Sequence, residues 1–359
     1  MDAIVVGLGF ASLNHWIPTI KDTPYFELIG GIDPVEDQQK KAKLQCPGIW
    51  TAASAQDIRG VNPDETAVFV VTPDHYPTIV EFAEYGFTNF IVEKPLVNRD
   101  HEVTTLQELI TKKNLRIYAV DHYYQKFLAL EFVLGNIRTE DPRVDALDTK
   151  DNHRLEQLRR CLGGIEGVTY ANLEAKELGI PYLNDHPWLE YDPEIGGVIR
   201  DLGPHAFAPL TRMGFLGPNP NLYDIQLLRL TEDRAHFTPV HSKHEVEMYV
   251  HTVLTYKGVT SNITFCKAPF EGKERSLSVR ASNGTFHAGL ARGQSGVVMT
   301  NDGRTTRLSL RKSENELVIE EAKLFFEGKL PGFDGNLNAA ITALKIGQGL
   351  RNSYFSILR

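Results

Sequence analysis

The stretch AIVVGLGFAS, residues 3–12, contains the turn that decides how the first part of the chain folds. Gly7 and Gly9 follow an apolar run that predicts a strand, and they precede a stretch that predicts a helix. Glycines in that context allow a tight turn and close approach of a pyrophosphate, whose charge the helix N-terminus stabilises. This pattern predicts a dinucleotide site, and a plain turn is the alternative because the third small position is serine. The predicted cofactor-binding residues here are Gly7, Gly9, Phe10, Ala11 and Ser12.

A carboxylate at the end of the second predicted strand strengthens this interpretation. The sequence GGID places Asp33 where an acidic side chain binds the ribose hydroxyls of NAD. A carboxylate there also repels the additional phosphate of NADP, and the chain continues Asp33-Pro34-Val35 without a nearby arginine. We therefore predict NAD as the cofactor, with NADP possible. A turn aspartate before proline is the structural alternative.

Apolar strands alternate with helical stretches up to about residue 121. That alternation predicts a parallel sheet with helices on both faces, and we assign residues 1–121 to a Rossmann NAD(P)-binding domain. The predicted strands are 3–9, 26–33, 66–73, 87–95 and 115–124.

The alternation of strands and helices ends in the second part of the chain. Strands with alternating apolar residues follow one another there, separated by turns that contain NG and DG. They predict a predominantly antiparallel sheet with one exposed face. We assign residues 122–334 to an α+β domain for substrate binding and oligomerisation, and residues 335–359 to a C-terminal helix that packs back on the first domain.

Composition excludes several classes of protein. The 359 residues are 42% hydrophobic and 23% charged, with a net charge of −8, which is typical of a globular protein that does not bind nucleic acid. No apolar run approaches the ~20 residues that cross a bilayer, so we expect no membrane association. Cys46, Cys161 and Cys266 show neither disulfide nor zinc spacing, and we predict a cytoplasmic location.

The sequence FIVEKP, residues 90–95, ends a buried strand on a lysine held next to proline. Ligands of such sheets bind outside the carboxyl ends of the strands, so Lys94 would project beside the cofactor. A solvated lysine after a strand is the alternative. The predicted cofactor-binding residues around the same crevice, which include those of the earlier stretch TPDH, are Thr72, Pro73, His75, Glu93 and Lys94.

A second chemical pattern is GGVIRDLGPHAFAPL, residues 196–210. Asp201 and His205 are four residues apart, and they share one face if the segment is helical. Histidine has the unperturbed pKa that suits proton transfer near neutral pH, and a nearby aspartate can orient it. A capping aspartate and a core histidine are the alternative.

In combination, these motifs resemble the glucose–fructose oxidoreductase/inositol dehydrogenase/MocA family over essentially the whole chain. The resemblance implies a Rossmann domain and an open-faced sheet domain, with NAD or NADP bound between them. It also implies Lys94, Asp201 and His205 as catalytic residues and a Lys–Pro bond that is often cis. The open sheet carries apolar residues at alternate positions, as in VEMYVHTVLTY, and an apolar sheet face is a common dimer surface. We therefore predict a homodimer or homotetramer, which the resemblance supports.

One segment departs from that family. Residues 121–126, DHYYQK, resemble a motif of glucose-6-phosphate dehydrogenase. The resemblance implies that Asp121 supports His205, and that His122, Tyr123 and Lys126 face a phosphate or sugar hydroxyls. A phosphorylated substrate and a neutral sugar or polyol both stay open, as does a packing role for these side chains.

The resulting hypothesis is a hydride transfer between NAD(P) and a secondary alcohol or ketone of a sugar, polyol or sugar phosphate. Trp188 could present an aromatic face to the sugar. We predict no metal site, because strand alternation scatters His241, His244, Glu247 and His251. The alternatives are a non-catalytic dinucleotide-binding regulator, and an enzyme of the same fold whose redox chemistry is transient.

Overall fold

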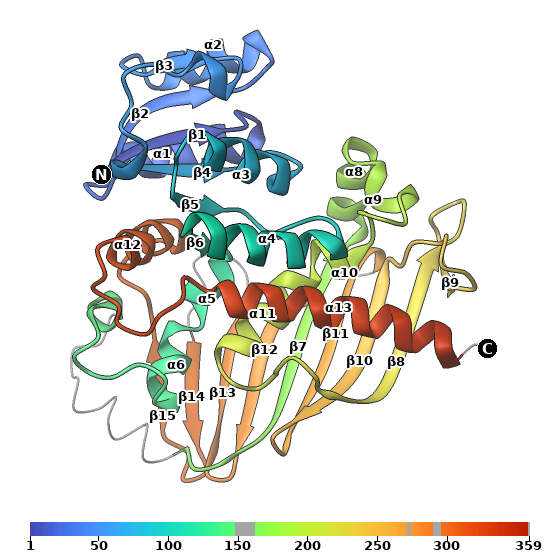
Figure 1. The fold of residues 1–359 in the computed structure, drawn as a ribbon. Coiled ribbons are helices and arrows are strands. Elements are labelled where there is room, and N and C mark those ends of the chain that lie inside the picture. The colour runs from blue at the N-terminus through green and yellow to red at the C-terminus, as the bar shows by residue number, and fades with distance from the viewer. Residues whose placement is uncertain (148–161, 271–273, 290–295, 358–359) are drawn as a thin grey trace. The chain divides into compact units, whose positions relative to one another are not determined.

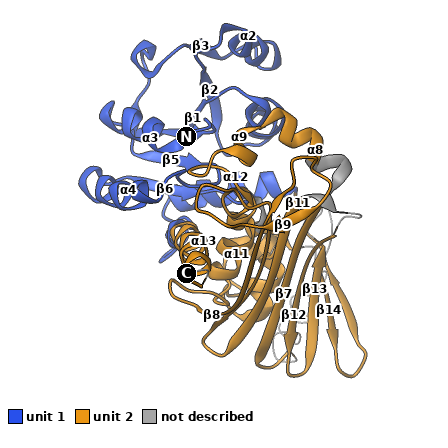
Figure 2. Cartoon of the chain, turned by 90° about the vertical axis from the view of Figure 1, so that its right-hand side faces the viewer, with its two compact units in different colours: residues 1–122, 313–338 blue, residues 123–312, 339–359 orange. Residues whose placement is uncertain are grey.

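The computed structural model describes residues 1–147, 162–270, 274–289 and 296–357, so Cys161 lies outside the described residues. The chain forms two compact units (Figure 2). Unit 1 contains Met1–His122 and Ser313–Asn338, and unit 2 contains Tyr123–Lys312 and Ala339–Arg359. Each unit is built on one sheet (Figure 1).

Unit 1 has the predicted Rossmann architecture. Its described strands form a six-stranded parallel sheet in the order β3-β2-β1-β4-β5-β6. The strands are β1 (Asp2–Val6), β2 (Glu27–Ile32), β3 (Trp50–Ala52), β4 (Thr66–Val70), β5 (Asn89–Val92) and β6 (Arg116–Ala119). The helices between them are the π-helical turn η1 (Ser12–Trp16), α1 (Ile17–Asp22), α2 (Glu36–Gln45), α3 (His75–Glu84) and α4 (Asp100–Lys113), with 3-10 turns at Ala55–Asp57 and Pro63–Glu65.

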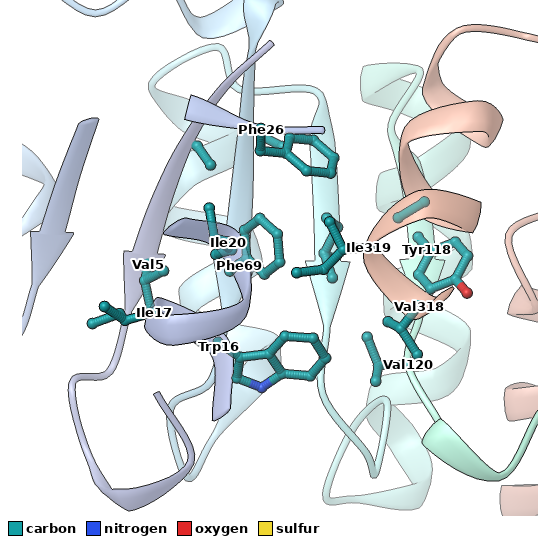
Figure 3. Packing of buried hydrophobic residues seen from close by; sticks show 14 of the residues in the cluster. Val5, Trp16, Ile17, Ile20, Phe26, Phe69, Tyr118, Val120, Val318 and Ile319 are labelled. Carbon is teal, nitrogen blue, oxygen red and sulfur yellow. The ribbon is translucent and has the colours of Figure 1, made fainter. Parts of the chain in front are cut away.

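A helix from far along the chain completes the core of unit 1. Helix α12 (Glu314–Phe326) begins with a capping box in which Ser313 Oγ accepts from Glu316 N–H. It contributes Val318 and Ile319 to an apolar cluster with residues of β1, β4 and α1 (Figure 3). At the same place Tyr118 Oη donates to Glu321 Oε1 over 2.8 Å. Burial of this apolar face fixes α12 on the sheet.

Unit 2 contains the second predicted sheet. Its described strands form a nine-stranded sheet in the order β15-β14-β13-β12-β7-β11-β10-β8-β9. All neighbours are antiparallel except β7 and β11, which run parallel. The strands are β7 (Ile165–Ala175), β8 (Asn221–Leu230), β9 (Phe237–Pro239), β10 (Tyr249–Tyr256), β11 (Val259–Phe270), β12 (Glu274–Ala281), β13 (Gly284–Gly289), β14 (Gly296–Thr300) and β15 (Thr305–Leu308). The helices are α5 (His122–Lys126), α6 (Leu128–Leu134), the 3-10 turn η4 (Pro142–Ala146), α8 (Lys176–Asp185), α9 (Trp188–Tyr191), α10 (Val198–Asp201), α11 (Gly203–Arg212) and α13 (Leu337–Ile357).

The alternating apolar residues of this sheet lie on its buried face. Phe207 of α11 packs edge-on against Phe265 of β11, with ring centroids 5.7 Å apart, and Val250 and Leu254 of β10 are also buried. The other face carries short and mostly polar side chains. One row of paired residues across it is His287, Ser278, Thr169, Asn262 and Val253. The exposed face is therefore more polar than the strand pattern suggests.

The C-terminal part of the chain divides between the two units. Ser313–Asn338 belong to unit 1 and Ala339–Arg359 to unit 2, and the packing of residues 335–359 on the first domain stays a prediction. Within unit 2, Arg351 of α13 donates to Glu247 over 2.8 Å, and Tyr354 Oη donates to the Val240 carbonyl over 3.1 Å. These polar contacts come from residues more than a hundred positions away, so local sequence does not indicate them.

Truncation of Ile319 should destabilise unit 1. Its side chain is fully buried in the cluster of Figure 3, and replacement by alanine leaves a cavity. We expect Ile319→Ala to lower the free energy of unfolding by about 2–5 kcal/mol in chemical denaturation. Leu44→Ala, at a position where the side chain is 82% exposed, is the control and should change it little. Equal effects of the two substitutions would contradict the packing of α12.

Candidate active site

The glycine turn after β1 approaches the end of β4 closely. Gly7 has a φ of +88°, which favours glycine. A Cβ atom at this position would lie 2.8 Å from Thr72 N and 2.9 Å from the Val71 carbonyl. A Cβ at Gly9, in contrast, would meet nothing within 4 Å, so the backbone there borders open space. This is the arrangement in which a pyrophosphate can approach the main chain.

The third small position of the fingerprint has its own structural role. Ser12 is buried, and its Oγ donates a hydrogen bond to the Gly7 carbonyl, which closes the turn. The first hydrogen bond of the following helix runs from Leu13 N–H to the Gly9 carbonyl over 3.0 Å. The N–H groups of Phe10 and Ala11 precede it, and they are the groups that would hold a pyrophosphate.

Asp33 has the predicted position at the end of β2, but it also supports the turn. Its Oδ2 accepts from Leu8 N–H over 2.7 Å, and its Oδ1 accepts from Val35 N–H over 2.8 Å. A carboxylate has about four acceptor sites, so each oxygen can still accept from a ribose hydroxyl. The turn, the helix start and this carboxylate together fit a dinucleotide.

Lys94 follows β5 at the same edge of the sheet. The Lys94–Pro95 peptide bond is cis, as the family resemblance implies. Glu93 fixes the backbone at Lys94, because its Oε2 accepts from Lys94 N–H over 3.0 Å. Its Oε1 accepts from Trp16 Nε1 over 2.9 Å. Glu93 is thus a bridge between η1 and β5, and Lys94 is half-buried at the strand end.

Thr72 and Pro73 lie in the loop after β4, which the sequence predicted to border the crevice. Thr72 Oγ1 donates to the Asp74 carbonyl over 2.9 Å, and the Pro73 carbonyl accepts from Asn98 Nδ2 over 2.6 Å. His75 begins α3, and its Nδ1–H donates to the Pro95 carbonyl over 2.6 Å. His75 therefore fixes the proline that follows Lys94.

In unit 2, the predicted Asp201 and His205 are both buried. We predicted that they share a helical segment, but the segment divides at Leu202 into α10 and α11. The cause is Pro204, which has no N–H to donate to the carbonyl of Arg200. Asp201 therefore ends one helix, and His205 lies in the first turn of the next.

The DHYYQK segment spans the boundary of the units. Asp121 is buried after β6 in unit 1, and Lys126 is buried at the end of α5 in unit 2. The side chains of His122 and Tyr123 lie outside the described ones. The pairing of Asp121 with His205 stays a prediction, because it joins residues of different units. Trp188 begins α9, where its side chain is partly exposed.

Sequence reasoning missed one buried charge beside Asp201. Lys267 of β11 forms an ion pair with Asp201 Oδ2 and lies 3.8 Å from Glu174 Oε2 of β7. The signal was available, because a lysine within the apolar strand sequence ITFCKAP is unusual. Burial raises the pKa of the neighbouring Cys266 thiol to about 12, so this cysteine is unreactive at neutral pH.

Two further observations concern metal ligands and membrane-spanning helices. Among the described residues, no group of three or more His, Cys, Asp or Glu side chains is placed to hold a metal ion. In the same part of the chain, no helix combines the length and the apolar character that a membrane span requires.

With this geometry established, comparison with known families is informative. Residues 1–122 match the model of the Gfo/Idh/MocA oxidoreductase family, NAD-binding Rossmann fold. The match covers the Rossmann domain and not the rest of the chain. The Rossmann domain is thus an NAD(P)-binding domain of an oxidoreductase. No curated protein sequence matches the chain.

Solved structures share the fold of both units. KijD10, a 3-ketoreductase from Actinomadura kijaniata in complex with NADP and TDP-benzene, is 15% identical, with a TM-score of 0.68 and 96% of each chain covered. An oxidoreductase from Agrobacterium radiobacter in complex with NAD+, L-tartaric acid and magnesium is 15% identical, with a TM-score of 0.69 and coverage of 98% of this chain and 97% of the other. The dehydrogenase MviM from Clostridium difficile is 14% identical, with a TM-score of 0.68 and coverage of 98% and 99%.

The buried His75 should make stability depend on pH. Burial lowers the pKa of His75 from 6.5 to about 4, against the opposing effect of its bond to Pro95. Between these pH values the unfolded chain binds more protons than the folded chain. The contribution of His75 to stability is therefore fully present above about pH 6.5 and is lost as the pH falls toward 4.

The test compares wild type with His75→Asn, which keeps a donor but cannot titrate. From pH 7 to pH 4, the unfolding free energy of wild type should fall relative to His75→Asn by up to about 3 kcal/mol. Denaturant titrations at several pH values measure this difference. His101→Asn, at an exposed position of α4, is the matched control. A constant difference between wild type and His75→Asn would contradict the neutral, buried histidine.

Proposed function

We propose that the protein transfers a hydride between NAD(P) and a secondary alcohol or ketone of a sugar, polyol or sugar phosphate. The observation that carries the proposal is the placement of Lys94. It follows β5 at the edge where Gly7, Asp33 and Thr72 form the dinucleotide cradle, and Glu93 and the His75–Pro95 bond fix its backbone. A cation so constrained beside a cofactor cradle suits electrostatic stabilisation of a reacting oxygen.

The nicotinamide, when bound, accepts or donates the hydride. In the oxidation direction, His205 takes the hydroxyl proton as general base, and Asp201 or Asp121 orients its ring. Lys94 donates a hydrogen bond to the same oxygen and stabilises the negative charge that develops there. In an alternative assignment, Lys94 takes the proton and His205 binds the substrate.

The substrate class is part of the proposal. KijD10 was crystallised with TDP-benzene and the Agrobacterium protein with L-tartaric acid, so this fold accommodates nucleotide-linked and hydroxylated ligands. Here the partly exposed Trp188 offers an aromatic face to a sugar ring. His122, Tyr123 and Lys126 are the proposed contacts to a phosphate or to sugar hydroxyls.

Organisation and location complete the proposal. We assign the dinucleotide to residues 1–121 and the substrate groups to the domain that follows, and we propose a homodimer or homotetramer in the cytoplasm. NAD is favoured over NADP, because Asp33 repels an additional phosphate.

Removal of the Lys94 ammonium should separate catalysis from cofactor binding. We expect Lys94→Met to reduce turnover by about 10²-fold or more, because the reacting oxygen loses a hydrogen-bond donor and the positive charge that stabilises it. NAD affinity, measured by fluorescence titration, should stay unchanged. Lys112→Met, on the exposed surface of α4, is the matched control. Wild-type turnover of Lys94→Met would remove this residue from the mechanism.

A substrate screen distinguishes a phosphorylated from a neutral substrate. Sugars and polyols are each tested beside their phosphate ester, with NADH absorbance as readout. If Lys126 contacts the phosphate, Lys126→Met should raise the Michaelis constant of the ester about 10- to 100-fold, since a charge-assisted hydrogen bond is lost. The constant of the neutral partner should change little. Equal changes for both substrates would exclude a phosphate contact.

A further inference from the structure

Neither the family motifs nor the proposed reaction assigns a function to the buried Lys267. Only 3% of the residue is exposed, although lysine is rarely buried without partners. The two neighbouring strands fix its position. Lys267 is paired directly with Glu174 of the parallel strand β7, and its N–H donates to the Met248 carbonyl over 3.0 Å. The backbone of Lys267 is thus hydrogen-bonded within the sheet.

The ammonium contacts groups that recognise a cation. Asp201 Oδ2 forms an ion pair with it, Glu174 Oε2 lies 3.8 Å away, and the centre of the Tyr182 ring lies 3.5 Å away. Arg275 Nη2 donates to the other oxygen of Glu174 over 2.6 Å. Two cations and two carboxylates therefore form a balanced network, which is the condition under which buried charges are tolerated.

Tyr182 connects this network to the segment that carries Trp188. Its ring stacks on His186, with centroids 4.2 Å apart and planes at 18°. His186 in turn meets Trp188 edge-on, at a centroid distance of 6.3 Å. A continuous series of contacts therefore leads from Asp201 through Lys267 and Tyr182 to the proposed sugar-binding tryptophan.

The same segment is fixed from other sides. Arg234, in the turn between β8 and β9, donates to both oxygens of Glu190 in α9, over 2.5 and 3.2 Å. It also donates to Asn184 of α8 over 2.7 Å. A Cβ at Gly196 would lie 2.5–2.9 Å from the carbonyl oxygens of Trp188, Leu189 and Asp192, so only a glycine allows the chain before α10 to approach α9 this closely.

We propose that Lys267 is a positioning residue, which aligns the Asp201 carboxylate and the Tyr182–Trp188 aromatic segment as one unit for substrate. The inference rests on the proposed function, since it assigns Lys267 to the same reaction. Lys267 acts through Asp201 and Tyr182 and does not itself contact the reacting atoms. Its replacement should therefore impair substrate turnover and leave the cofactor site in unit 1 unchanged.

The kinetic test uses three variants of the full chain. Lys267→Met removes the charge at similar length, and we expect kcat to fall about 10²-fold because the reacting groups lose alignment. NAD affinity should match that of wild type. Lys267→Arg keeps the charge and should recover most of kcat. Arg280→Met removes an exposed cation from strand β12 of the same sheet and should have wild-type kinetics. Wild-type kcat of Lys267→Met would overturn the inference.

A stability test needs no substrate and separates this inference from the proposed function. Lys267→Met removes the cation that pairs with the buried Asp201 carboxylate, so its melting midpoint should fall by about 5–15 °C. The addition of Asp201→Asn should raise the midpoint again, because one uncompensated charge is removed. Additive effects of the two substitutions would overturn the pairing. If the midpoint recovers in the double variant but the wild-type protein turns over none of the tested substrates, the proposed function alone is refuted.

If Lys267→Met does not fold, Lys267→Gln replaces it in both tests. Glutamine keeps a donor toward Asp201 but carries no charge. Failure of both variants to fold would also overturn the inference, because Lys267 would then be required for folding and not for alignment.

Discussion

A side chain at position 7 would collide with the backbone of Val71 and Thr72. The candidate site residues at the carboxyl edge of the parallel sheet of unit 1 depend on this close approach. It joins the ends of β1 and β4, which are neighbours in the parallel sheet. From there, main-chain bonds continue the edge, since Val71 N–H donates to the Val6 carbonyl and Glu93 N–H to the Val70 carbonyl. Each strand end is thus positioned by the one beside it, and Lys94 follows directly from the last. Its precise location is a property of the sheet and not of its loop.

The parts of this edge that sequence could predict are those whose cause is local. A glycine with positive φ, a helix that begins after a turn, and a proline after Lys94 all depend on adjacent residues. The roles of the two acids were harder to predict. Asp33 and Glu93 were predicted as cofactor contacts, and both have structural partners as well, which are Leu8 N–H and Trp16 Nε1. Trp16 is 77 positions from Glu93, so a sequence pattern cannot show that contact.

Elements whose stability comes from distant neighbours were missed or misassigned. Strand β7 was not predicted, because GIEGVTYANLEA contains two glycines and few apolar alternations. Its strand conformation comes from β11 and β12, which pair with it on both sides. Helix α12 could have been identified from its capping box at Ser313 and Glu316, but only tertiary burial shows that it belongs to unit 1.

The segment that carries Asp201 illustrates why buried charges can be retained when they add little net stability. Because Pro204 interrupts its hydrogen bonds, α10 cannot hold its own geometry as part of a longer helix. One end of α10 is held by a carboxylate that belongs to an ion pair, and the other end by a direct ion pair to Asp201. Glu247 accepts from Ile199 N–H near the start of α10 and pairs with Arg351, and burial raises the pKa of this carboxyl while Arg351 opposes that effect. Lys267 holds Asp201 at the end. Such pairs roughly balance their desolvation cost, so their value here is geometric: each is satisfied in one arrangement of α10.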